Sequence, residues 1–170
     1  MRYLKFIIPS IVLLLGCGDG LQEPEETMPT LALSPDTLSI MLGQEGDLAL
    51  QIEDFDVSIF GISMRIAYDS SNVSFNKSTG FASGDFFGSN IVAFVEDEPP
   101  LIYLTVTLQQ GQQEVSGTGE LGKLTFIGKS PGSGTIEIIS SELIFFDSDG
   151  NEVIIPGLEI EIATVTAKHG

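Results

Sequence analysis

The stretch that decides the fold of this chain is FGISMRIAYD, residues 60–69. Apolar residues come at every second position of this stretch, with small or polar residues between them: Ile62, Met64, Ile66 and Tyr68. A period of two is that of a β-strand, because successive side chains of a strand point to opposite sides of its sheet. We therefore predict a strand with one buried face and one outward face, the latter carrying Ser63 and Arg65.

The same alternation recurs along the rest of the chain. Further alternating segments lie at 38–42, 48–52, 102–108, 124–126, 136–138 and 160–162. Turn signals separate them, at 43–46, 69–72, 99–100, 117–119, 131–134 and 149–151. No stretch has a convincing helical period. About nine short strands without a helix predict an all-β fold, either an antiparallel sandwich or a jelly roll.

The first seventeen residues have the order of a secretory signal peptide. Arg2 and Lys5 precede an apolar run at 6–15, which is too short to cross about 30 Å of hydrocarbon. The run ends in LLGC, residues 14–17, which resembles the lipobox of bacterial lipoproteins. This resemblance implies cleavage before Cys17 and a diacylglycerol on its sulfur. An ordinary signal peptide with a stray cysteine is the alternative.

The leader predicts three segments and a location. We expect a signal peptide at 1–16, a lipidated Cys17 with a flexible acidic tether at 17–30, and one folded domain at 31–168. The product is then an exported lipoprotein that touches the membrane only through its lipid. Gly18 rather than Asp follows the cysteine, so the familiar signal for retention in the inner membrane is absent. We expect the outer membrane, with surface exposure left open.

The charge of the chain excludes some partners. All 24 Asp and Glu follow Cys17, whereas only five Lys and Arg do, so the mature chain has a net charge of 5 − 24 = −19. A nucleic-acid-binding protein needs a basic face for the phosphates, and a basic patch is also needed for adsorption on anionic lipid. We therefore expect no nucleic-acid partner and no membrane contact besides the lipid anchor.

Few residues in the chain are suited to catalysis. The one histidine, His169, is the penultimate residue, where chains are usually mobile, and no cysteine follows Cys17. Common catalytic triads and zinc sites are therefore excluded. Paired carboxylates remain at 53–56 and 96–98, where we expect solvated strand ends. These observations predict a protein that is not an enzyme.

The segment DSDGN, residues 147–151, raises the question of calcium. In an EF-hand loop glycine comes sixth, but here Gly150 comes fourth, so the motif does not match. Asp-Gly-Asn between two apolar runs is typical of a hairpin turn, in which Gly and Asn accept positive φ. We expect a turn and no cofactor, with a weak calcium site at Asp147 and Asp149 as the alternative.

Several segments, taken together in their order, resemble the cohesin domains of cellulosome scaffolds. The resemblance covers about residues 31–167 and rests on the segments GDL (46–48), FGISMRIAYD (60–69), GDFF (84–87), GELGKLTF (119–126) and FDSDGNE (146–152). It implies a nine-stranded jelly-roll β-sandwich that binds a dockerin module of another protein without catalysis. In one branch of the family an Asn and an Asp on the third strand contact the dockerin. Gly61 and Ser63 stand at the matching positions, so the contact must differ here.

The resemblance also implies where a partner binds, since one sheet face of cohesins meets the dockerin. On that face we expect an outward strip along 102–109, with two further residues beside it from the strand at 60–69. The predicted partner-binding residues are Ser63, Arg65, Tyr103, Thr105, Thr107 and Gln109. Three alternatives stay open: a carbohydrate-binding module that captures polysaccharide, a structural lipoprotein without a partner, and a merely solvated face. Tyr103 is the one promising exposed ring, and Phe94 and the Phe86–Phe87 pair are further candidates for partial exposure.

Overall fold

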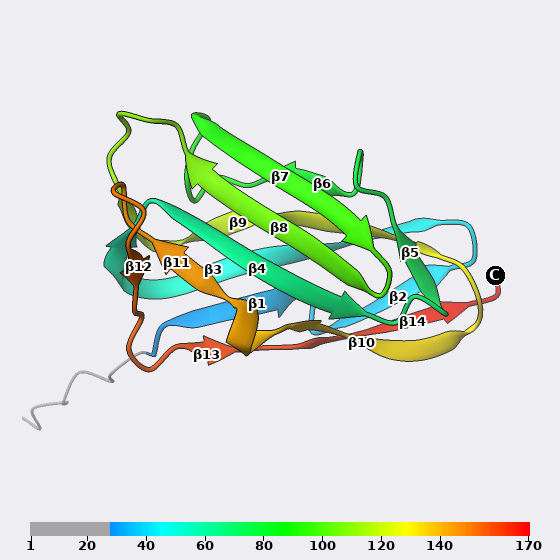
Figure 1. The fold of residues 1–170 in the computed structure, drawn as a ribbon. Coiled ribbons are helices and arrows are strands. Elements are labelled where there is room, and N and C mark those ends of the chain that lie inside the picture. The colour runs from blue at the N-terminus through cyan, green and yellow to red at the C-terminus, as the bar shows by residue number, and fades with distance from the viewer. Residues whose placement is uncertain (1–27) are drawn as a thin grey trace, which may run out of the picture.

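The computed structural model describes residues 28–170, so Cys17 and most of the tether lie outside the described residues. Residues 28–170 form fourteen strands and one 3-10 turn, η1 (Ser140–Glu142) (Figure 1). In this part of the chain no helix is long and apolar enough to cross a membrane. Nine of the strands have five residues or more, and the other five have only two or three. The predicted all-β fold is confirmed.

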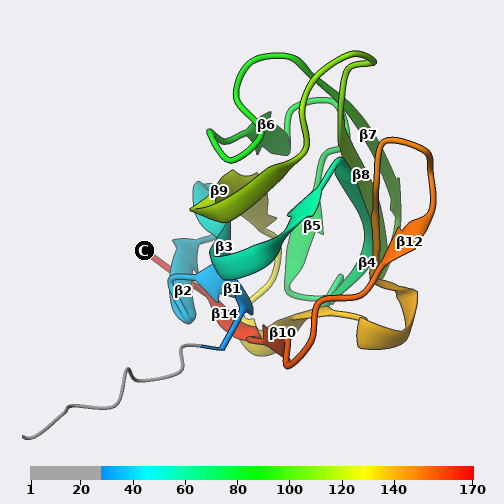
Figure 2. The same ribbon diagram turned by 90° about the vertical axis from the view of Figure 1, so that its left-hand side faces the viewer.

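The strands form two sheets, which Figure 2 shows as facing layers. Sheet A has the order β13-β1-β3-β9-β5, and β6 also pairs with β9. Its strands are β1 (Thr30–Ser34), β3 (Glu45–Ile59), β5 (Val73–Phe75), β6 (Phe81–Ser83), β9 (Val115–Gly128) and β13 (Glu159–Ile160). Long antiparallel pairing of β3 with β9 holds this sheet together, interrupted by three register shifts.

Sheet B contains the strand that the segment at 60–69 predicts, which is β4. Its order is β12-β11-β4-β10-β14-β2, while β8 pairs with the other edge of β4 and β7 pairs with β8. Its strands are β2 (Thr37–Met41), β4 (Gly61–Tyr68), β7 (Ile91–Glu98), β8 (Leu101–Leu108), β10 (Gly132–Ile138), β11 (Ile144–Phe146), β12 (Glu152–Val153) and β14 (Ala163–Lys168). The named strand pairs are antiparallel, except β1 with β13 and β2 with β14.

The core lies between the two sheets and is held by aromatic contacts from one to the other. Phe55 of β3 meets Phe145 of β11 edge to face, with ring centroids 5.5 Å apart. Tyr68 of β4 lies 5.7 Å from Phe126 of β9. Aromatic pairs of this kind contribute about 0.5–1.5 kcal/mol beyond the area that they bury. The inward residues of both sheets thus form one continuous apolar core.

Several local predictions were wrong, among them the turn at 131–134, since residues 132–134 already belong to β10. Phe86 and Phe87 are buried, because Phe86 packs edge to face on Phe55 with centroids 6.5 Å apart and also contacts Phe87. Residues 117–119 lie inside β9 instead of forming a turn, and Gly117 has a positive φ there. Residues 53–56 likewise lie inside β3, where a register shift accompanies the positive φ of Asp54.

Candidate functional site

The pairing of β4 with β8 brings most of the predicted partner-binding residues onto one surface. Ser63 lies opposite Thr105, and Arg65 lies opposite Tyr103. Directly opposite residues of an antiparallel pair point to the same side of the sheet. The neighbours of these residues along each strand, such as Met64 and Leu104, are buried, so Ser63, Arg65, Tyr103 and Thr105 point away from the core. The structure therefore places them side by side on the outer surface of sheet B.

Thr107 and Gln109 end this strip differently. Thr107 still lies in β8, opposite Gly61, and its hydroxyl donates to the carbonyl of Leu108 at 3.2 Å. Gln109 lies just after the last residue of β8, exposed, and its carbonyl accepts the Gln112 N–H of the following turn. The expected alternation therefore stops at Leu108, and Gln109 belongs to the loop at the end of the strip.

Arg65 and Tyr103 form a fixed pair. The guanidinium carbon of Arg65 lies 4.8 Å from the centroid of the Tyr103 ring, in a cation–π contact. Arg65 also makes an ion pair with Glu142 of η1, but its side chain is 41% exposed and such surface pairs contribute little to stability. The two contacts instead hold the ring and the guanidinium in one orientation, with one face of the ring covered.

Exposed apolar side chains continue the strip on both sides. On β7, Phe94 lies opposite Thr105 and Val92 lies opposite Thr107. On β11, Ile144 lies opposite Ser63. Their exposed fractions are 65% for Phe94, 37% for Val92 and 47% for Ile144. One row across the sheet thus reads Phe94, Thr105, Ser63 and Ile144, with two hydroxyls 2.9 Å apart between two exposed apolar groups.

We name this surface the β7–β8–β4 face. It consists of the outward residues Val92, Phe94, Glu96, Tyr103, Thr105, Thr107, Ser63 and Arg65, with Ile144 at its border. The sequence predicted the polar part and named Phe94 as a candidate for partial exposure, which is confirmed, but it did not single out Val92 or Ile144. The apolar run IVAFV at 91–95 is uninterrupted, so it does not show which of its residues point outward.

Gly61 leaves room on this face for an aromatic ring. An added Cβ at Gly61 would lie 2.3 Å from Cζ of Phe146 and 3.0 Å from Cβ of Thr107. Phe146 of β11 lies opposite Gly61 and covers it. The outward space at residue 61 is therefore filled by the ring of another residue.

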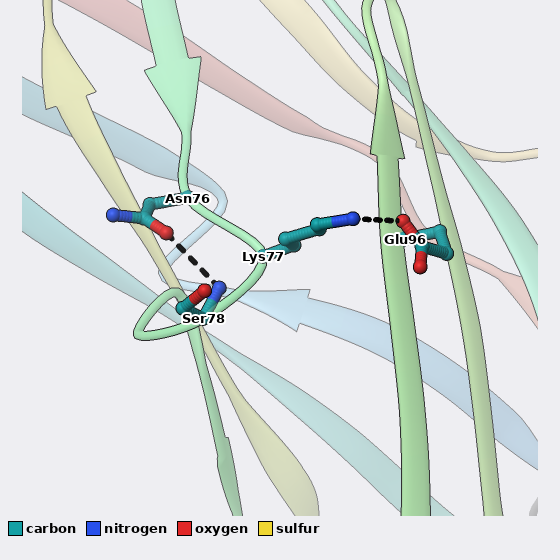
Figure 3. Close-up of polar contacts among 4 residues, drawn as sticks. All are labelled: Asn76, Lys77, Ser78 and Glu96. Carbon is teal, nitrogen blue, oxygen red and sulfur yellow. Dashed lines mark hydrogen bonds and ion pairs between the residues drawn. The ribbon is translucent and has the colours of Figure 1, made fainter.

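Charged groups surround the acidic end of β7. Figure 3 shows Lys77, in the loop after β5, reaching Glu96 on β7, and the Nζ–Oε2 distance is 2.6 Å. In the same loop the Asn76 side chain accepts the Ser78 N–H at 3.0 Å.

The Tyr68 hydroxyl donates to Asp97 at 2.8 Å. Burial, followed by this hydrogen bond, raises the pKa of Tyr68. Asp97 thus points inward and ties β7 to Tyr68, although a solvated strand end was predicted there.

The segment 147–151 forms the expected hairpin turn between β11 and β12. The Asp147 carboxylate accepts the backbone N–H groups of Asp149 and Asn151, at 3.0 and 2.8 Å, and the Asn151 side-chain amide at 2.9 Å. The bonds from Asn151 are the main reason that the pKa of Asp147 lies below its ordinary value. Both oxygens of Asp147 therefore have partners within the turn. Among residues 28–170, no cluster of three or more His, Cys, Asp or Glu is arranged to hold a metal ion.

The architecture defines the class of this protein as a jelly-roll β-sandwich. No family model and no curated protein matches the chain. Among solved structures it is similar to a non-cellulosomal cohesin from the archaeon Archaeoglobus fulgidus, with a TM-score of 0.65 and 16% identity over 84% of this chain and 92% of that one.

Two cohesins of bacterial origin are similar to the same degree. The seventh ScaB type I cohesin from Pseudobacteroides cellulosolvens has a TM-score of 0.66 and 16% identity, over 84% of this chain and 94% of that one. The third ScaC cohesin from Acetivibrio cellulolyticus, solved in complex with the ScaB dockerin, has a TM-score of 0.65 and 12% identity, over 82% and 99%. The fold of this chain is therefore the cohesin fold.

Proposed function

We propose that this domain is a non-catalytic recognition module that binds a dockerin-type protein through the β7–β8–β4 face. The observation that carries the proposal is the row of exposed Phe94 and Ile144 with two hydroxyls between them. An apolar contact with polar groups beside it is typical of protein interfaces, where aromatic residues and Arg carry much of the binding energy. The ScaC cohesin in complex with a dockerin adds support from the same fold.

A carbohydrate-binding module is the second candidate, because the exposed Phe94 ring lies beside hydroxyl groups. A sugar needs a free aromatic face, however, and the Arg65 guanidinium covers one face of Tyr103. Phe94 is then the most exposed ring of the β7–β8–β4 face, at 65%. A single free ring favours a protein partner over a polysaccharide. We place the module within polysaccharide-degrading machinery, because the resemblance is to the cohesins of cellulosome scaffolds.

Titration calorimetry tests the proposal on residues 18–170, which lack the lipid attachment site. A panel of dockerins and a panel of soluble polysaccharides serve as ligands. We expect dockerin binding, and we expect Phe94→Ala to weaken it by about 2 kcal/mol if the ring is a hot spot. Lys123→Ala is the matched control, because Lys123 is exposed on β9 of the other sheet.

The possible outcomes separate the candidates. Polysaccharide binding that is lost in Phe94→Ala, without dockerin binding, would favour the carbohydrate module. Equal losses in Phe94→Ala and Lys123→Ala would place the site elsewhere. No binding to either panel would favour the remaining alternative, a structural lipoprotein without a partner.

We further propose that the domain is exported and anchored through a lipid on Cys17, at the outer membrane. The support is the positive start, the short apolar run and the LLGC segment at residues 14–17. Labelling of cells with a fatty-acid analogue tests the anchor. The label is expected on the unsubstituted chain and absent from Cys17→Ser, and equal labelling of both would contradict the lipobox. Protease treatment of whole cells then shows whether the domain lies at the surface.

A further inference from the structure

The strand β7 is an edge of sheet B. It pairs along its whole length with β8, from Ile91 opposite Leu108 to Glu98 opposite Leu101. Within residues 28–170, its backbone has no hydrogen-bonding partner on the other side. An unpaired edge presents a row of N–H and C=O groups that can accept a further strand.

The backbone bonds determine which residues of β7 present these groups. The Gln109 N–H donates to the carbonyl of Asn90 at 2.9 Å, so this pair is a hydrogen-bonded one. The next pair, Ile91 with Leu108, is not, since the Leu108 N–H donates to Phe60 on the other side. Hydrogen-bonded and non-hydrogen-bonded pairs alternate in antiparallel sheets. The free groups therefore belong to Ile91, Ala93, Val95 and Asp97.

The two halves of β7 differ in how well their side chains protect the free edge from pairing with another strand. In the acidic half, Lys77 binds Glu96 and the Tyr68 hydroxyl binds the inward Asp97. Charged and inward-pointing residues are devices that prevent edge strands from pairing. In the apolar half, IVAFV at 91–95, no residue is charged, so this half lacks such devices. Val92, Ala93 and Phe94 are exposed there.

From this asymmetry we infer that β7 pairs with β7 of a second copy of this chain, antiparallel, about a twofold axis at Ala93. In this register the free groups of Ala93 meet those of Ala93 of the second copy, and Ile91 meets Val95. On the outward side Phe94 lies opposite Val92 of the second copy, so both exposed groups gain an apolar neighbour. Sheet B then continues through the axis into the second copy.

The charges agree with this register. Residues 96–98 of one copy come opposite residues 90–88 of the other, which are Asn, Ser and Gly. Like charges directly opposite one another would destabilise the pair, and this register avoids them. The chain as a whole carries a net charge of −17, so the two copies still repel at long range. We therefore expect the dimer to become stronger as salt rises, because salt screens that repulsion.

Disulfide formation tests the register in the full chain. In a hydrogen-bonded antiparallel pair the Cα atoms are about 5.5 Å apart, a separation that a disulfide can span. Ala93→Cys is therefore expected to form a covalent dimer on mild oxidation. Glu98→Cys is the matched control, because in this register its two copies are ten positions apart, or about 34 Å. The unsubstituted chain reports any cross-linking through Cys17.

Two further variants test the edge without oxidation. Ala93→Pro removes a free N–H that faces away from β8, and proline is tolerated at such edge positions. Ala93→Lys places two like charges at the axis. Light scattering of the full chain in detergent, corrected for bound detergent, is expected to give twice the chain mass at high protein concentration and salt. Both variants are expected to give the monomer, with the circular dichroism spectrum unchanged.

The dimer shares Val92 and Phe94 with the proposed dockerin site but needs no dockerin, and the Ala93 variants test it while leaving both side chains in place. A chain that stays monomeric at all concentrations and salt levels would overturn it. So would equal cross-linking of Ala93→Cys and Glu98→Cys, or a dimer that persists in both Ala93→Pro and Ala93→Lys. In each case the calorimetric test of the β7–β8–β4 face would still stand.

Discussion

The outer surfaces of the two sheets differ, although the strands of both alternate in the same way. On sheet A, Thr125 donates to Asp47 at 2.8 Å and Gln51 donates to Glu120 at 3.5 Å, so polar side chains pair with one another. In the described part of the chain, none of the large exposed apolar residues lies in β1, β3 or β9. On sheet B, Phe94 and Ile144 are exposed beside hydroxyl groups. Alternation therefore identifies outward residues, and exposed apolar side chains identify the outward surface suited to a partner.

The largest effect is expected from shortening an inward side chain of β8, compared with shortening an outward one. Leu104 is 1% exposed, so Leu104→Ala is expected to lower the free energy of unfolding by about 2–5 kcal/mol. Tyr103→Ala, one position away, removes an outward ring and is expected to change the melting temperature little. Urea denaturation of both variants measures the difference. A large loss in Tyr103→Ala with little change in Leu104→Ala would mean that the two sides of this strand are assigned backwards.

Arg65→Glu reverses one charge on the β7–β8–β4 face and leaves the outer surface of sheet A unchanged, so it tests sheet B separately. The substitution removes the contact with Tyr103 and places a second carboxylate near Glu142. We expect binding of an acidic partner to weaken about tenfold, or about 1.4 kcal/mol, and binding of a neutral glycan to stay unchanged. Calorimetry with both kinds of ligand measures the two effects. Unchanged affinity for every ligand would show that Arg65 lies outside the contact.

Tyr68→Phe tests the inward anchor of the edge strand. The loss of one hydrogen bond to Asp97 is expected to cost about 1 kcal/mol of unfolding free energy. The pKa of Tyr68 is raised by folding, so its contribution is complete below the ordinary pKa of 10.0 and is lost as pH rises above it. The wild-type protein is therefore expected to lose stability in alkali more steeply than Tyr68→Phe. Parallel pH curves for the two proteins would contradict this role.

The smallest effect is expected at the turn between β11 and β12. Folding lowers the pKa of Asp147, mainly through the bonds from Asn151, so its contribution is complete above the ordinary value of 3.8 and is lost as pH falls below it. Asp147→Asn is expected to flatten the acid side of the stability curve slightly. Asp149→Asn is the control, since the Asp149 carboxylate accepts no hydrogen bond from residues 28–170. Acid titrations of thermal unfolding compare the two variants.

The alternating sequence was sufficient to predict the central strands and their faces. Residues 62–68 and 102–108 each alternate without interruption, and the structure pairs them as β4 and β8. Period two fixes which side of a strand is buried, and the resemblance to cohesins supplied the order of the strands. Together they were enough to place Ser63 and Arg65 beside the strip at 102–109, whereas the register of the two strands is known only from the structure.

The rest depended on information that alternation does not carry. The apolar run at 91–95 does not show that its strand is an edge, so the exposure of Phe94 was not resolved from the sequence. Gln109 continues the alternation in the sequence, but the turn that brings Gln112 N–H to its carbonyl ends the strand before it. Phe86 is buried by a long-range contact with Phe55, and Phe87 packs on Phe86, so no local pattern reports the burial of this pair.

The Phe146 ring over Gly61 limits which side chains residue 61 can carry. An Asn at position 61 needs the space that the ring fills, because even a Cβ there would lie 2.3 Å from it. Gly61→Asn alone therefore forces the ring out of place, whereas the same substitution is accommodated once Phe146 has become a small residue. An asparagine at this position is therefore best introduced together with a smaller residue at position 146. The ring and the glycine are sterically coupled, so the two positions are best varied as a pair.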